Sequence, residues 1–202
     1  AGDVVLITGP SGTGKSVLLR AVHGCLTKKM SLPQGVAIEH GEVNGPSRVS
    51  WVTDIDLSKA PVDLLAHVSL ERALAMLGVA GLAESSLFVR PASTLSDGQK
   101  YRLAIACAAV EDPQVLLIDA FCEPLDDLTA AAVCKGIVNL SKRTGMVVVV
   151  ATASPDRLLS ALQPDIVVQL LPGKSLKIHT RPNTNGARDE NKEGNNINAV
   201  KG

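Results

Sequence analysis

The chain has 202 residues, of which 46% are hydrophobic and 20% are charged, a composition typical of one compact globular domain rather than a disordered or fibrous chain. Its 20 basic and 20 acidic residues cancel, so no overall field attracts the protein to nucleic acid or to an anionic membrane. Aromatic residues make up only 2%, which leaves few of the stacking platforms that single-stranded nucleic acid requires. We therefore do not expect a nucleic-acid-binding module.

The apolar runs of the chain are short. The longest, at residues 147–151 and 166–171, fall far below the roughly 20 residues that span a bilayer, so no direct membrane insertion is expected. The N-terminal segment enters a strand-like run at residues 4–7 without a basic region or a cleavage site, and no secretory signal is predicted. We expect a soluble, cytoplasmic protein.

The first half of the chain begins with a strand at residues 4–8, a Gly-rich turn and a helix at 16–24. Residues 25–45 are rich in turn signals, and the expected short strands within them lie at 36–38 and 42–43. A further strand at 48–52 is followed by small helices between residues 61 and 87, where apolar residues form a helical face.

The second half alternates strands with helices, which is typical of a doubly wound, mostly parallel α/β sheet. Gly145 is expected to end the helix predicted at 128–143. From His179 onward the sequence is polar and lacks apolar periodicity, so residues 1–178 are predicted to form the domain and 179–202 a flexible tail or linker. The predicted helices lie at 99–110, 128–143 and 156–162, and the predicted strands at 115–118, 147–151 and 166–171, the last of these being the last apolar strand.

The four cysteines are scattered without the CxxC spacing of a metal or redox site. Three of them fall in apolar surroundings, where cysteine usually acts as a small hydrophobic residue. We expect structural thiols at Cys25, Cys107, Cys122 and Cys134.

A phosphate-binding loop is predicted between the first strand and the first helix, because residues 9–16 fit the pattern GxxxxGK[ST]. Its glycines let backbone N–H groups surround phosphate oxygens, and a chain of this length would contain the pattern by chance about once in a hundred. Lys15 is expected to contact the β- and γ-phosphates of ATP, and Ser16 to place its hydroxyl on Mg²⁺. The alternative, a turn that only caps a helix, needs neither the lysine nor these glycines. The predicted nucleotide-binding residues are Gly9, Pro10, Ser11, Gly12, Thr13, Gly14, Lys15, Ser16 and Val17.

A second part of the site is predicted at Asp119, which follows the apolar strand at 115–118. A carboxylate at the carboxyl end of a parallel strand can hold Mg²⁺ through water. Taken alone this is a weak signal, because an aspartate after a buried strand is often only a turn residue or a helix cap. Beside a phosphate-binding loop, the metal role is favoured.

Residues 94–99, Thr-Leu-Ser-Asp-Gly-Gln, resemble the signature loop of ABC-type (ATP-binding cassette) P-loop ATPases, with Asp97 in place of the first glycine of the usual Leu-Ser-Gly-Gly-Gln. Ser96, Gly98 and the first N–H groups of the following helix would form a second anion site; the alternative is a serine that only caps the helix. The resemblance implies a P-loop NTPase fold with a small helical signature subdomain at about 58–98. It also implies that the signature residues Ser96, Asp97, Gly98 and Gln99 close on ATP bound to a partner, in a homodimer or with a paired ABC domain.

The resemblance covers about residues 2–175 and includes several departures from the family. Ala120 stands where the family has the glutamate that polarises the attacking water, and Ala153 stands at the position of the γ-phosphate-sensing histidine. Asp54 replaces a glutamine, and either reaches Mg²⁺ through water or is an ordinary turn residue. Residues 123–126, Glu-Pro-Leu-Asp, replace Ser-Ala-Leu-Asp and keep Asp126 for contacts across the dimer.

Two explanations of Ala120 remain open: it is native, or it results from an engineered Glu→Ala change that traps the ATP-bound dimer. Either way, the missing group predicts ATP binding with impaired hydrolysis, since phosphate binding does not depend on it. The expected activity is thus that of an ATP hydrolase with a very low rate.

The chain starts at the strand before the phosphate-binding loop, without the leading strands that carry an adenine-stacking aromatic in the family, which leaves adenine recognition unexplained. Residues 95–102, 121–126 and 164–166 most resemble ABC-type ATPases fused to a predicted acetyltransferase domain, and a domain cut from a longer protein would explain this start. The leading hypothesis is a switch for an attached or partner effector domain. The alternatives are a nucleotide-binding subunit of an ABC membrane transporter, a DNA-repair or chromosome-organising head, and a nucleotide sensor without turnover.

Overall fold

The computed structural model describes residues 2–27, 48–172 and 175–181. The strands expected at 36–38 and 42–43, and the predicted tail from residue 182 onward, lie outside the described residues. Within the described ranges, no helix is both long enough and apolar enough to cross a membrane.

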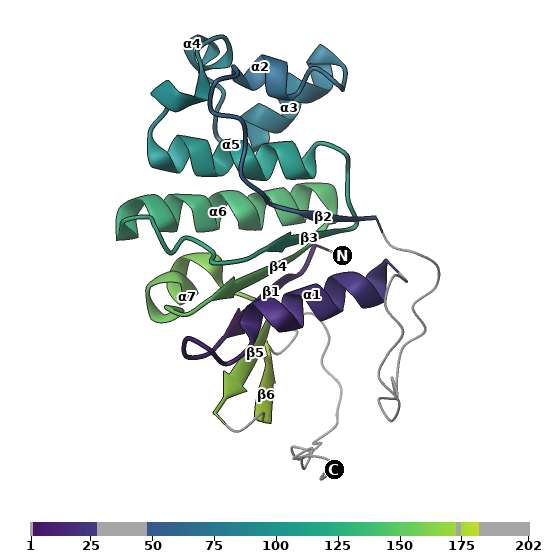
Figure 1. Ribbon diagram of the computed structural model, residues 1–202, viewed down its shortest axis with the longest axis vertical. Coiled ribbons are helices and arrows are strands. Elements are labelled where there is room, and N and C mark those ends of the chain that lie inside the picture. Colours follow the sequence, from purple (N-terminus) through teal and green to yellow (C-terminus); the bar gives the residue numbers. More distant parts are fainter. Residues whose placement is uncertain (1, 28–47, 173–174, 182–202) are drawn as a thin grey trace, which may run out of the picture.

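A six-stranded sheet forms the centre of the molecule, in the order β2-β3-β4-β1-β5-β6 (Figure 1). Strands β1 to β5 are all parallel to one another, and β6 pairs antiparallel with β5. This confirms the predicted mostly parallel α/β sheet. The strands are β1 (Val4–Thr8), β2 (Val49–Trp51), β3 (Val115–Ile118), β4 (Val147–Thr152), β5 (Ile166–Leu171) and β6 (Ser175–Thr180).

Strand β6 was not predicted, and it follows the strand at 166–171, which the sequence predicts as the last apolar one. All of its residues are exposed, so it is an edge strand without the apolar run that marks a buried one. Leu176 and Ile178 alternate with polar residues, a pattern that was available in the sequence. The strand ends at Thr180, beyond the predicted domain boundary at 178.

Helices cover both faces of the sheet, because successive strand residues point to opposite sides. On one face, Leu6, Leu116 and Val150 are buried in the main hydrophobic core, which α5 and α6 cover. On the other, Ile7 and Leu117 are buried in a smaller cluster that includes Leu19 of α1. The flanking helices are α1 (Lys15–Leu26), α5 (Asp97–Ala109), α6 (Asp127–Thr144) and α7 (Asp156–Leu162).

A group of short helices lies between β2 and α5 in the chain and beyond α5 in space (Figure 1). Its Leu65, Leu77 and Leu82 are almost fully buried and join the main core. Burying each of these leucine side chains contributes about 1.5–3 kcal/mol to stability, which holds the group of short helices against the sheet domain. These elements are α2 (Pro61–Leu64), α3 (Leu70–Val79), α4 (Ser85–Phe88) and the 3₁₀ helix η1 (Ala92–Thr94).

Candidate functional site

The loop between β1 and α1 has a backbone that requires glycine. Gly9, Gly12 and Gly14 have φ angles of 150°, 80° and 96°, where other residues are strained. A Cβ atom on Gly9 would also lie 2.5 Å from the carbonyl oxygen of Leu170. Helix α1 begins at Lys15, so the N–H groups of its first turn have no acceptor within the helix and can bind an anion.

Lys15 folds back over this loop. Its Nζ donates hydrogen bonds to the carbonyl oxygens of Gly9 at 2.8 Å and Pro10 at 3.0 Å. The Pro10 carbonyl also accepts from the Thr13 hydroxyl at 2.8 Å. Gly9, Pro10 and Thr13 therefore shape the loop and hold the lysine, with its positive charge at the start of α1.

A cavity of about 430 Å³ lies beside the loop. It brings the loop together with residues that follow β3 and β4, because parallel neighbouring strands end at the same edge of the sheet. We call it the P-loop cavity. It is lined by Ser11, Gly12, Gly14, Lys15, Ser16, Val17, Asp119, Ala120, Glu123 and Ala153.

Asp119 is half-buried and lies among the residues that line this cavity. Its Oδ1 accepts a hydrogen bond from the backbone N–H of Ala120 at 3.0 Å. Ser16 and Asp119 line the same cavity, and hydroxyl and carboxylate oxygens are donors that Mg²⁺ prefers. These two residues fit a Mg²⁺ site.

Asp54 is placed differently. It lies in a neighbouring groove of about 670 Å³, which also borders Asp119, Asp97 and Lys100, and it is not among the residues that line the P-loop cavity. The structure thus brings Asp54 near Asp119 but not to the phosphate-binding loop.

Glu123 is a site residue that the sequence reasoning missed. It lines the P-loop cavity, and its Oε1 accepts a hydrogen bond from the backbone N–H of Ala153 at 3.0 Å. Ala120 and Ala153 line the same cavity. The signal available in the sequence was an acidic residue four positions after Asp119.

The signature residues form the start of α5, which begins at Asp97 rather than at the predicted Gln99. Ser96 Oγ accepts from the Gln99 N–H at 3.3 Å, and Gln99 Oε1 accepts from the Ser96 N–H at 2.9 Å, a reciprocal cap. A Cβ on Gly98 would lie 2.4 Å from Thr129 Cγ2, so the glycine permits close packing of α5 on α6. Asp97 forms an ion pair with Lys100 at 3.3 Å.

None of these signature residues is among those lining the P-loop cavity. Asp97 lies instead on the neighbouring groove. Within one chain, the serine cap and the phosphate-binding loop are therefore parts of separate sites.

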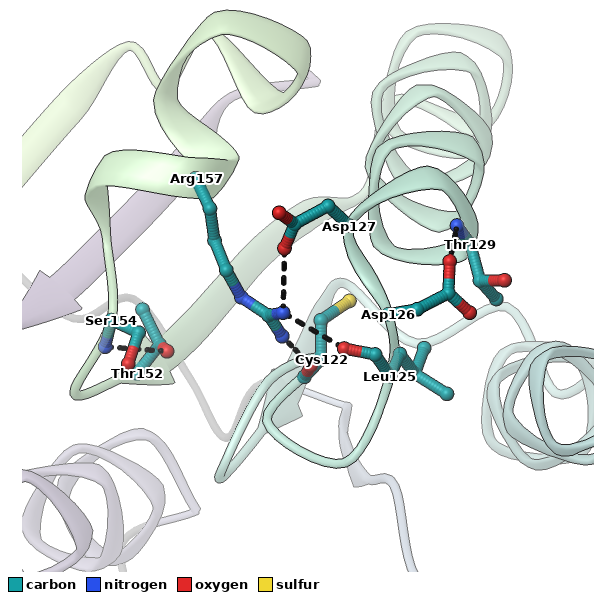
Figure 2. Close-up of polar contacts among 8 residues, drawn as sticks. All are labelled: Cys122, Leu125, Asp126, Asp127, Thr129, Thr152, Ser154 and Arg157. Atoms are coloured by element: carbon teal, nitrogen blue, oxygen red, sulfur yellow. Dashed lines mark hydrogen bonds and ion pairs between the residues drawn. The ribbon is translucent and has the colours of Figure 1, made fainter.

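The segment from Cys122 to Asp127 connects β3 to α6 and is held by Arg157 of α7 (Figure 2). The guanidinium donates to the carbonyl oxygens of Cys122 and Leu125 and to Asp127 Oδ1. At the end of the segment, Asp126 caps α6 by accepting from the Thr129 N–H at 2.9 Å, and its hydrogen bonds from Thr129 lower the pKa of Asp126.

Cys122 has a φ of 58°, an unusual angle for a non-glycine residue. Its N–H donates to the hydroxyl of Tyr101 at 3.1 Å, and burial raises the pKa of Tyr101 above its usual range. Cys122 and Cys134 are buried, while Cys25 and Cys107 are half-buried. Burial raises the pKa of Cys107 to about 11, which keeps this thiol protonated at neutral pH.

Comparison with known proteins gives a consistent group of relatives. A family model described as ABC transporter matches residues 1–124. The aliphatic sulfonates import ATP-binding protein SsuB of Delftia acidovorans is 34% identical over 182 residues, which cover 88% of this chain and 72% of that protein. The zinc import ATP-binding protein ZnuC of Jannaschia sp. (strain CCS1) is 31% identical over 163 residues, or 79% of this chain and 65% of that protein.

A solved structure extends the likeness to three dimensions. It is a dimeric ATP-binding cassette in a post-hydrolysis state, bound to ADP and Pi. It superimposes with a TM-score of 0.64 at 25% identity and covers 89% of this chain and 85% of that one. This chain spans less than two thirds of the length of the zinc import protein.

Proposed function

This chain belongs to the ABC transporter family of ATP-binding proteins, and from this we propose that it binds Mg-ATP in the P-loop cavity and hydrolyses it slowly to ADP and phosphate. The observation that carries the proposal is the meeting of Lys15, Ser16 and Asp119 in one cavity. A lysine, a hydroxyl and a carboxylate around a glycine-rich loop are what binding of a magnesium–triphosphate requires.

Each residue has a role that follows from its place. Lys15 would exchange its bonds to the carbonyls of Gly9 and Pro10 for the β- and γ-phosphates, which a cation binds more strongly than a neutral oxygen. The first N–H groups of α1 would donate to the same phosphates. Ser16 and Asp119 would hold Mg²⁺, which neutralises phosphate charge.

Impaired hydrolysis is supported by two methyl groups in the cavity. Ala120 and Ala153 can neither accept a proton nor polarise water, and they occupy the positions of the family's glutamate and histidine. Binding of the triphosphate does not require either group, so we expect the chain to bind ATP strongly and to hydrolyse it slowly.

We further propose that ATP joins two such domains. Ser96, Gly98 and the amides at the start of α5 would contact the γ-phosphate held by a second copy or by a paired ABC domain, and Asp126 would lie in the contact. Their separation from the P-loop cavity of their own chain supports this arrangement, as does the dimeric relative.

ATP-driven closure would act as a switch for an attached or partner effector domain. The attached domain rests on the resemblance of residues 95–102, 121–126 and 164–166 to acetyltransferase-fused cassettes. A second candidate is the nucleotide-binding subunit of a membrane transporter, which the names of the sulfonate and zinc import relatives favour. Stoichiometric co-purification with a polytopic membrane protein would select the second candidate.

The binding proposal is tested by equilibrium titration of a fluorescent ATP analogue with Mg²⁺. Lys15→Ala should weaken binding roughly 10- to 150-fold, since a hydrogen bond to a charged group contributes about 1.5–3 kcal/mol. Lys135→Ala, an exposed change on α6, is the matched control and should leave the affinity unchanged. Equal affinities for the native chain and Lys15→Ala would refute binding at this loop.

A further inference from the structure

A carboxylate is present in the P-loop cavity despite the alanine at position 120. Glu123 lines the cavity together with Lys15 and Asp119. Its Oε1 is bonded to the N–H of Ala153 at 3.0 Å, and this bond uses one of the two carboxylate oxygens. The bond spans two loops, since Glu123 follows β3 and Ala153 follows β4.

The backbone on both sides of Glu123 is anchored. Before it, the Cys122 N–H donates to the Tyr101 hydroxyl, and the Cys122 carbonyl accepts from Arg157. After it, the Leu125 carbonyl accepts from the same guanidinium at 2.8 Å (Figure 2). The exposed Glu123 side chain therefore starts from a backbone that is held in place. A group that must orient a reactant needs such a fixed position.

The turn before Glu123 directs this placement. Ala120 and Cys122 both have positive φ angles, 48° and 58°, and the intervening Phe121 is fully buried with its N–H bonded to the Ala151 carbonyl at 2.7 Å. Because the buried Phe121 lies between two residues of left-handed conformation, the chain turns sharply after β3. Glu123 thus follows immediately on a turn that borders the cavity.

We propose that Glu123 is the carboxylate that orients and deprotonates the attacking water in this chain, in place of the glutamate missing at position 120; this rests on the proposed function. The water oxygen forms a bond to the γ-phosphorus, and the bond from that phosphorus to the β–γ bridging oxygen breaks, with its electron pair staying on ADP. One water proton passes to the Glu123 carboxylate and then to the released phosphate or to solvent. The products are ADP and phosphate, with no other reactant required.

The negative charge of Glu123 distinguishes a role in deprotonating water from a role in binding ATP. A carboxylate near a triphosphate repels it, and Lys15 and Mg²⁺ offset that repulsion. Glu123→Gln removes the repulsion and the proton acceptor, but its amide oxygen can still accept from the Ala153 N–H. The substitution therefore separates catalysis from both nucleotide binding and loop positioning.

The test is single-turnover hydrolysis of Mg-ATP over hours, with ATP affinity and melting temperature measured on the same samples. Glu123→Gln should lower the hydrolysis rate about 100-fold or more, while its ATP affinity is equal or higher and its melting temperature unchanged. Glu71→Gln, an exposed change in the first turn of α3, is the matched control and should keep the native rate.

Several results would overturn this assignment. A Glu123→Gln rate within twofold of native excludes the proton-accepting role. Loss of rate in Glu123→Ala but not in Glu123→Gln would show that Glu123 only positions Ala153. Absence of any hydrolysis in the native chain also contradicts it, and if that chain still binds ATP, the binding part of the proposed function stands.

Discussion

Arg157 and Leu125 belong to different elements, and the guanidinium Nη1 of Arg157 donates a hydrogen bond to the Leu125 carbonyl oxygen at 2.8 Å. The same nitrogen lies 3.0 Å from Asp127 Oδ1. Through these contacts α7, which follows β4, holds the segment that carries both Glu123 and Asp126. One side chain therefore couples the candidate hydrolytic group to the predicted dimer contact.

Replacing Arg157 with alanine should lower the free energy of unfolding by about 2–3 kcal/mol, because two backbone carbonyls lose a charged donor. Asp127→Asn should lower it by less than about 1 kcal/mol, since the Asp127 side chain is 81% exposed and exposed ion pairs contribute little. Urea unfolding measures both changes. Similar losses in the two variants would show that the ion pair, not the carbonyl bonds, holds the segment.

Tyr101→Phe should lower the free energy of unfolding by about 1–2 kcal/mol, because the Cys122 N–H loses its acceptor next to a left-handed backbone. Hydrogen exchange at the Cys122 amide should also accelerate. Unchanged stability together with unchanged exchange would mean that another group, such as water, replaces the tyrosine hydroxyl.

Gly9→Ala should lower the free energy of unfolding by about 2 kcal/mol or more, since the added Cβ collides with the Leu170 carbonyl and the φ of 150° disfavours alanine. Gly136→Ala is the matched control: nothing lies within 4 Å of its added Cβ, and alanine within a helix should stabilise by about 0.5–1 kcal/mol. Thermal unfolding compares the two. Small changes in stability of equal size in the two variants would contradict the close approach of Gly9 to Leu170 of β5.

Much of the sheet can be predicted from local pattern. Strands β1, β3 and β5 have the predicted bounds, because each is a short apolar run in a sheet that helices cover, and Gly145 ends α6 in the left-handed conformation as expected. β6 was missed because an exposed edge strand has no apolar run. The position of the glycine-rich loop before α1 follows from its motif, and the placement of Asp119 beside it follows from its position after β3.

The role of Glu123 could not be predicted in the same way, since it depends on contacts between residues distant in sequence. Its bond to Ala153 joins positions 30 residues apart, and the Arg157 contacts that hold its loop span 32 and 35 residues. The sequence shows the acidic residue but not the neighbouring strand ends that bring it to the cavity. The same limitation applies to Asp54, whose groove is formed with α5.

Ala120→Glu should raise ATP turnover by up to roughly 10²-fold, because Glu123 already supplies about 10²-fold of the 10²- to 10⁴-fold that a positioned general base contributes, with ATP affinity little changed. Ala120→Gln, which adds a side chain of nearly equal size but without a basic carboxylate, is the control and should not raise the rate. Steady-state phosphate release measures the native chain and both variants. Equal rates for the native chain and Ala120→Glu would remove this position from the hydrolytic chemistry.

We propose that Mg-ATP bound at Lys15 joins two of these domains. The decisive measurement is sedimentation velocity of the native chain and of Lys15→Ala, each with and without Mg-ATP. We expect a monomer that becomes a dimer only when the native chain is given Mg-ATP, with Lys15→Ala monomeric throughout. A native chain that stays monomeric in saturating Mg-ATP, or dimerises equally well with Lys15→Ala, would contradict it.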